Sequence, residues 1–159
     1  MKISNITTDK IINILDYIPL QLRAKNECKA TEYFTIRKGD RSLLEIAFDS
    51  EDATIHRITL LICEEYQKIL EPYYVPNDCK KGDISVNTPG EIDSPTFRCE
   101  VYPNAIRILV SDADSCECVF AENVVWELTE KGDLVSICIL DPTGKASNHC
   151  YRELEANHQ

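Results

Sequence analysis

Long apolar stretches are missing from this sequence. No segment approaches the roughly 18 consecutive apolar residues that a membrane-spanning helix needs. Residues 1–19 combine a basic residue near the start with no apolar core, a composition that does not match a secretion signal. We therefore expect no membrane partner and a cytoplasmic location.

Glycine and proline are also scarce, at five and seven residues of 159. This scarcity excludes collagen-like and linker-like material. The rest of the composition is ordinary for a folded protein, because 43% of the residues are hydrophobic and 28% are charged. The chain is long enough to bury a core, and we expect a single domain over residues 1–159.

Positive charge is the third shortage. Seventeen Lys and Arg residues oppose 27 Asp and Glu residues, a formal net charge of −10. Binding to a nucleic acid or to an acidic membrane needs the opposite sign, so we expect neither partner. A negative protein is suited to rapid capture of a basic protein, although net charge affects solubility first.

Recognisable catalytic motifs are absent as well. The sequence lacks the Gly-rich nucleotide loops, the His-Glu-x-x-His zinc motif and the Gly-x-Ser-x-Gly elbow. His56 stands on an expected strand, where a lone histidine is more often structural than catalytic. His149 and Cys150 are neighbours on an expected helix and point about 100° apart. We expect no catalytic residue, no enzyme activity and no cofactor.

The cysteines form no Cys-x-x-Cys pair; they are residues 28, 63, 79, 99, 116, 118, 138 and 150. In a reducing compartment cysteines stay free, and a buried thiol packs like a small apolar group. We therefore expect free thiols and no metal site. A metal or redox site at Cys116 and Cys118, or an enzyme that uses His56, is the alternative.

Alternating apolar residues are the strongest positive signal. Over residues 119–140 they predict a long β-hairpin with its turn at residues 130–133. One register places every large side chain on a single face, as a sheet with one buried side requires. The expected pairs are Trp126 with Ile137, Val124 with Ile139 and Leu128 with Val135.

Two further hairpins are predicted by the same alternation, after a short strand at residues 33–36. Residues 42–48 pair with 55–62, and residues 97–102 with 105–111. The expected apolar pairs are Ile46 with Ile58, Leu44 with Leu60, Val101 with Ile106 and Cys99 with Ile108. On the opposite face Glu100 lies across from Arg107, a favourable cross-strand ion pair.

Helical spacing indicates two covering helices. Apolar residues at positions 11, 12, 14, 15 and 18 predict an N-terminal helix over residues 7–18, and residues 146–156 predict a C-terminal helix. A short helix is expected at residues 64–70. The fold class is then α+β: an antiparallel sheet of six to eight strands covered by both terminal helices. Consecutive hairpins can also curl such a sheet into a half-closed barrel.

Two acidic loops connect these strands. Their carboxylates belong to Asp49, Glu51, Asp52, Asp112, Asp114, Glu117 and Glu122. The spacing does not fit the twelve-residue calcium loop, which needs a Gly at its sharp turn. If the loops converge on one rim of the sheet, they form an anionic surface for Lys and Arg side chains of a protein partner. We predict these seven residues as partner-binding residues.

Two of the hairpin segments resemble parts of small bacterial immunity proteins. They are residues 42–61, a strand, an acidic turn and a strand, and residues 129–139, which include the Gly132 turn. Such proteins neutralise toxins of contact-dependent growth inhibition and related polymorphic systems. The resemblance implies a non-catalytic, cytoplasmic protein that binds a cognate basic toxin domain, often a nuclease.

One more function stays open. The connection over residues 71–96 is long and contains four of the prolines, and such a connection is often functional. Tyr73 and Tyr74 at its start either anchor an interface or pack the loop onto the sheet. A curved sheet with Trp126 near this loop would also suit a carrier of a small ligand.

Overall fold

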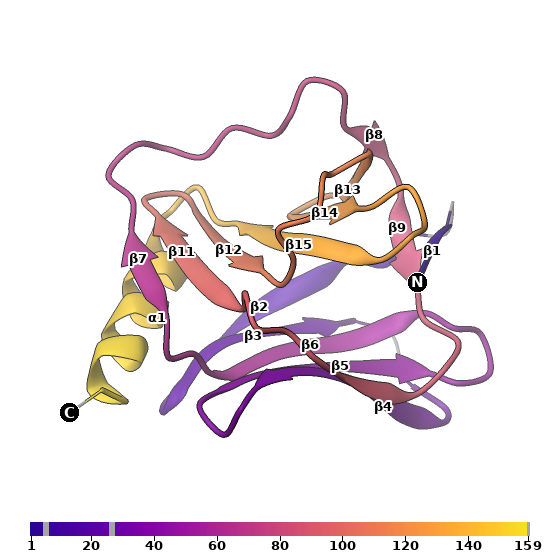
Figure 1. The fold of residues 1–159 in the computed structure, drawn as a ribbon, viewed down its shortest axis with the longest axis horizontal. Coiled ribbons are helices and arrows are strands. Elements are labelled where there is room, and N and C mark those ends of the chain that lie inside the picture. The colour runs from indigo at the N-terminus through magenta and orange to yellow at the C-terminus, as the bar shows by residue number, and fades with distance from the viewer. Residues whose placement is uncertain (5–6, 26–27, 159) are drawn as a thin grey trace.

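A computed structural model of the chain describes residues 1–4, 7–25 and 28–158. In these ranges fifteen strands and one helix are present, and most strands belong to two large sheets that lie face to face (Figure 1). The protein thus contains helix and sheet, as expected, but sheet dominates. Both sheets are open layers, and neither closes on itself.

The first layer is a six-stranded sheet of order β10-β4-β5-β6-β3-β2. Its strands are β2 (Lys10–Leu15), β3 (Ile18–Ala24), β4 (Thr31–Lys38), β5 (Ser42–Asp49), β6 (Ile55–Ile62) and β10 (Gly90–Asp93). Strand β10 runs parallel to β4, and the other neighbours are antiparallel. Strands β10 and β2 therefore form the two edges.

The second layer is a seven-stranded sheet of order β7-β11-β12-β15-β14-β13-β8. Its strands are β7 (Tyr66–Lys68), β8 (Lys80–Lys81), β11 (Arg98–Tyr102), β12 (Ala105–Leu109), β13 (Glu117–Ala121), β14 (Val124–Leu128) and β15 (Leu134–Leu140). A separate ribbon pairs β1 (Lys2–Ser4) with β9 (Asp83–Ser85). The helix α1 (Lys145–Ala156) contacts β3 of one sheet and β12 of the other.

The core lies between the two sheets. Trp126 and Ile137 from the seven-stranded sheet are fully buried in one cluster with Leu44 and Ile58 from the six-stranded sheet. Burying a side chain of this size contributes about 1.5–3 kcal/mol. The apolar faces that the alternation predicted are therefore the two inner faces. Trp126 belongs to this core and not to an open ligand pocket.

Most predicted strand pairs are confirmed. The observed pairs include Trp126 with Ile137, Val124 with Ile139, Ile46 with Ile58, Leu44 with Leu60, Val101 with Ile106, Cys99 with Ile108 and Glu100 with Arg107. The predicted pair of Leu128 with Val135 is wrong. Leu128 lies opposite Leu134, because the register shifts between Glu127 and Leu128.

The predicted N-terminal helix is wrong. Its residues form β2, a tight turn and the start of β3, with Tyr17 in the left-handed region at φ 69°. Ile11 is 49% exposed and Ile14 is 53% exposed, so the apolar residues occupy both sides of an edge strand. β-Branched side chains favour strands, and here that preference outweighs the helical spacing. The short helix expected at residues 64–70 is also absent, because that segment is extended and includes β7.

The predicted C-terminal helix is confirmed as α1, with Cys150 and Leu154 fully buried. His149 is buried and fixes this helix to the β2–β3 turn. Its Nε2 lies 2.9 Å from the carbonyl oxygens of Leu15 and Ile18. Both partners are acceptors, so Nε2 carries the proton. No helix within the described ranges has the length and apolar character to cross a membrane.

The long connection after β7 runs along the outer side of the seven-stranded sheet (Figure 1). Tyr73 packs there, with its ring 5.4 Å from the ring of Tyr102, whereas Tyr74 is 79% exposed. Under this cover Arg107 bridges Glu100 and Glu127 at 3.4 and 3.2 Å. The tyrosine at position 73 thus attaches the loop to the sheet.

The expectation that all cysteines are free is wrong, because Cys79 and Cys118 form a disulfide. Strand β8 pairs in parallel with β13, and Lys80 lies opposite Val119. The residues just before this pair, Cys79 and Cys118, are therefore adjacent, with Cα atoms 4.5 Å apart. Sequence spacing did not reveal this contact, since the two cysteines are separated by 39 positions.

We predict that Cys79→Ser lowers the free energy of unfolding by about 2–4 kcal/mol, because the disulfide restricts the unfolded chain. Urea denaturation without reductant measures the change. The control is Cys116→Ser, which removes an exposed free thiol and should leave stability almost unchanged. Adding reductant should bring the wild type to the level of Cys79→Ser. A wild type that is insensitive to reductant would contradict the assignment.

Candidate functional site

The predicted partner-binding carboxylates do not form one group. Asp49 is only 3% exposed at the end of β5. Its carboxylate accepts hydrogen bonds from the backbone N–H groups of Lys29 (3.0 Å) and Glu51 (2.9 Å). These hydrogen bonds, with Lys29 the larger cause, hold the pKa of Asp49 below its ordinary value of 3.8. Asp49 thus stabilises its own loop.

The other predicted acids lie in four neighbourhoods. Glu51 and Asp52 occupy the β5–β6 turn, where Asp52 accepts from the backbone and hydroxyl of Thr54. Glu117 borders a hollow that also contains Lys80 and Lys81. Glu122 occupies the β13–β14 turn, and Asp112 and Asp114 lie between β12 and β13. Within the described ranges no ion pair joins the two loops.

One of these acids, Asp112, lines a groove at the edge of the two sheets. The groove has a volume of about 440 Å³ and lies where the β10 edge meets the β14–β15 turn. We call it the acidic groove; its lining residues are Met1, Phe34, Ile92, Asp93, Ser94, Pro95, Thr96, Val110, Ser111, Asp112, Gly132, Asp133 and Leu134. Apolar side chains from both sheets thus share it with three carboxylates.

The groove is built on the segment that carries the chain from one sheet to the other. After β10, the N–H of Ser94 donates to the carbonyl of Arg37, and its buried hydroxyl donates to the carbonyl of Val110. The N–H of Phe97 then donates to the carbonyl of Ser94 before β11 begins. This side of the groove is therefore bound to Arg37 of β4 and to Val110, which directly follows β12.

The second side is a turn that only glycine suits. Gly132 has φ 86°, and a Cβ there would lie 3.1 Å from the carbonyl oxygen of Met1. The turn is closed by the N–H of Asp133, which donates to the hydroxyl of Thr129. The N–H of Thr129 donates in return to the carbonyl of Asp133. Asp133 is thereby presented at the rim by a rigid turn.

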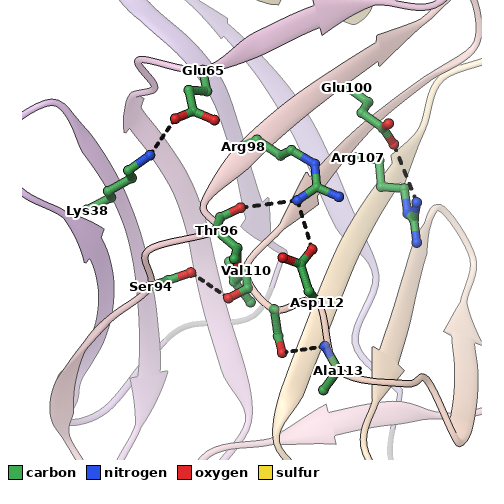
Figure 2. A network of polar contacts seen from close by, with 11 residues as sticks. Lys38, Glu65, Ser94, Thr96, Arg98, Glu100, Arg107, Val110, Asp112 and Ala113 are labelled. Atoms are coloured by element: carbon green, nitrogen blue, oxygen red, sulfur yellow. Dashed lines mark hydrogen bonds and ion pairs between the residues drawn. The ribbon is translucent and has the colours of Figure 1, made fainter.

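The three carboxylates of the groove differ in whether a positively charged side chain lies beside them. Figure 2 shows Arg98 and Asp112 pointing toward each other, with Nη1 3.1 Å from Oδ1. The same nitrogen donates to the carbonyl of Thr96 at 3.4 Å. The carboxylates of Asp93 and Asp133 form no ion pair with any residue that the structure describes. The rim thus has negative charge left for a cationic partner.

A single metal ion does not suit these carboxylates. In the part of the chain that the structure describes, no group of three or more His, Cys, Asp or Glu side chains is arranged to hold a metal. A flexible set of separate cations, such as Lys and Arg side chains, fits spaced carboxylates better. An exposed apolar residue of the lining, Ile92 at 44% exposure, adds contact area for such a partner.

The residues of the enzyme alternative are not gathered at this groove. His56 lies in β6, where burial and the charges of Arg23 and Arg57 lower its pKa below 6.5. Cys118 is in the disulfide, and the exposed thiol of Cys116 lines the same hollow as Cys118. His158 lies beyond α1, with its ring 5.0 Å from that of Tyr66.

Comparisons with known proteins supply no identification. Neither a scan against protein-family models nor a search of curated proteins finds a match to this chain.

Two groove residues were missed by the sequence reasoning. Asp93 is placed there by the parallel pairing of β10 with β4, which joins segments far apart in the chain. The sequence predicts Asp133 only as part of a turn. The Gly132 that precedes it was a usable signal, since a tight turn displays its flanking side chains.

The structural role of Asp49 gives a pH prediction. Because its folded-state pKa is lowered, its contribution to stability is present above the ordinary value of 3.8 and is lost as pH falls through the folded-state pKa. We expect Asp49→Asn to be less stable than the wild type at about pH 6, with the gap shrinking toward about pH 3. Urea denaturation across this range measures the gap. A gap that is constant with pH would contradict the role.

Proposed function

We propose that this chain is a binding protein that neutralises a basic toxin, in the manner of bacterial immunity proteins. The observation that carries the proposal is the acidic groove, in which Asp93 and Asp133 form no ion pair with the described residues and lie beside apolar lining residues. The net charge of −10 supports the same partner class, because it steers a basic protein toward this surface.

The resemblance to immunity proteins adds support at one point. The second resembling segment, residues 129–139, contains the Gly132 turn and Asp133 of the groove. In the proposed complex, Lys or Arg side chains of the toxin bind Asp93 and Asp133. An apolar side chain between them covers Ile92 and Phe34. Carboxylates in such positions either occupy the toxin's phosphate site or block its entrance.

A second candidate is a carrier of a small cationic ligand. A volume of about 440 Å³ lies within the usual range of small-molecule sites. The groove is formed by two edges and a turn, and Asp93, Asp112 and Asp133 are all exposed. This openness favours a protein partner, since a small ligand needs most of its surface covered.

The test uses the product of the neighbouring reading frame as the candidate toxin. We expect co-production of the chain to restore growth and the two purified proteins to form a complex. The combined variant Asp93→Asn, Asp112→Asn and Asp133→Asn should weaken binding about 10- to 100-fold, since each exposed charge contributes up to about 1 kcal/mol. The loss should be mainly in the association rate and should decrease at high salt.

A matched control removes the same number of charges outside the groove. Glu51→Gln, Asp114→Asn and Glu117→Gln are exposed acids of the wider rim that the sequence predicted. The groove proposal expects this control to bind nearly as tightly as the wild type. Equal losses in both triple variants would support a diffuse acidic surface instead, and absence of any complex would end the immunity proposal.

A further inference from the structure

A cluster of positive charge lies on this otherwise acidic protein. A hollow of about 470 Å³ opens on the outer face of the six-stranded sheet. We call it the basic hollow; the residues that matter here are Arg23, Lys25, Tyr33, His56 and Arg57. Acidic residues outnumber the seventeen Lys and Arg residues of the chain, so a hollow lined by three basic side chains is unusual for this protein.

The strand register brings two of these cations together. Arg23 in β3 lies directly opposite Arg57 in β6. Like charges in this position destabilise a sheet, whereas an opposite charge at either position would stabilise it. On its other side Arg57 lies opposite Ala47, which is paired with Tyr33 in β4. The small Ala47 lets Arg57 lie toward Tyr33, with Nη2 3.4 Å from the phenolic oxygen.

The positive charge is only partly neutralised. Arg57 is 3.4 Å from Glu45. Arg23 and Lys25 form no ion pair with the residues described in the structure. At physiological ionic strength charges are screened over about 8 Å, so carboxylates beyond this distance add little to the neutralisation of the hollow.

The positive charges of the hollow also act on the pKa of His56. It is the extra residue of a register shift, because Arg57 pairs with Ala47 while Ile55 pairs with Phe48. Burial lowers its pKa first, and the charges of Arg23 and Arg57 lower it further, opposed by Asp49. The imidazole thus lies close to Arg23 and Arg57, with Asp49 acting against them.

We propose that the basic hollow binds the phosphate group of a small anionic ligand, with Arg23 and Arg57 as its main ligands. Guanidinium groups match the oxygens of a tetrahedral anion in a bidentate way. The hydroxyl of Tyr33 accepts from Arg57 and can donate its own proton to the anion. The Tyr33 ring, 43% exposed, offers a surface for a planar group attached to the phosphate. This site is independent of the proposed toxin binding.

Sulfate is the first probe, because its charge does not change between about pH 5 and 8, the range in which histidines ordinarily titrate. Chemical shifts of His56 and the thermal midpoint are followed during titration with sulfate, against chloride at equal ionic strength. We expect saturable shifts and an affinity that falls as pH rises through the pKa of His56. The affinity falls in this direction because a bound anion stabilises the protonated imidazole of His56, and this form is lost as pH rises.

Three variants separate a binding site from general charge effects. Arg23→Gln should weaken sulfate binding at least tenfold and raise the thermal midpoint of the free protein, since a like-charge pair is removed. Glu45→Gln should tighten binding, because it frees Arg57. Arg41→Gln is the control: it removes one exposed charge outside the hollow and should change neither affinity nor midpoint appreciably.

The source of the phosphate is tested with two further probes. Adenosine monophosphate and ribose 5-phosphate carry the same phosphate, but only the first carries a base. Tighter binding of the nucleotide that is lost in Tyr33→Leu indicates stacking on the ring, and equal binding indicates recognition of the phosphate alone. Sulfate shifts that are absent, not saturable or unchanged in Arg23→Gln would overturn the proposal.

Discussion

The structure depends on one constraint: the apolar inner faces of the two large sheets must bury each other. Trp126 and Ile137 meet Leu44 and Ile58 across this interface, all fully buried. A layer built this way leaves only its edges, turns and outer faces for binding. Both surfaces that we assign follow from this, since the acidic groove lies at an edge and the basic hollow lies on an outer face.

Sequence alone predicted the parts of the fold that are local. Hairpin pairs such as Trp126 with Ile137 were correct because alternation and a short turn determine the register together. The N-terminal helix was wrong because the isoleucines of an edge strand can be exposed on both sides, so their spacing imitates a helical stripe. The turn that ends β2 was not detectable either, since Tyr17, and not a glycine, adopts the left-handed conformation.

The candidate site was only partly predictable for a related reason. Asp112 was expected, but its neighbours in the groove depend on the parallel pairing of β10 with β4 and on the crossover that follows. Asp49 was expected to be free because it lies in an acidic turn. It is buried because short carboxylates accept backbone N–H groups near their own position. Composition identifies an acidic loop without indicating which of its acids are already engaged.

Strand β4 relates the two surfaces to each other. Phe34 lines the acidic groove and Tyr33, the preceding residue, lines the basic hollow. Successive side chains of a strand point to opposite faces, so the two surfaces lie on opposite sides of the same sheet. A protein at the groove therefore does not cover the hollow, and both sites can be occupied at once. Opposite charges kept on opposite faces also prevent each site from neutralising the other, so each can keep its charge for a partner.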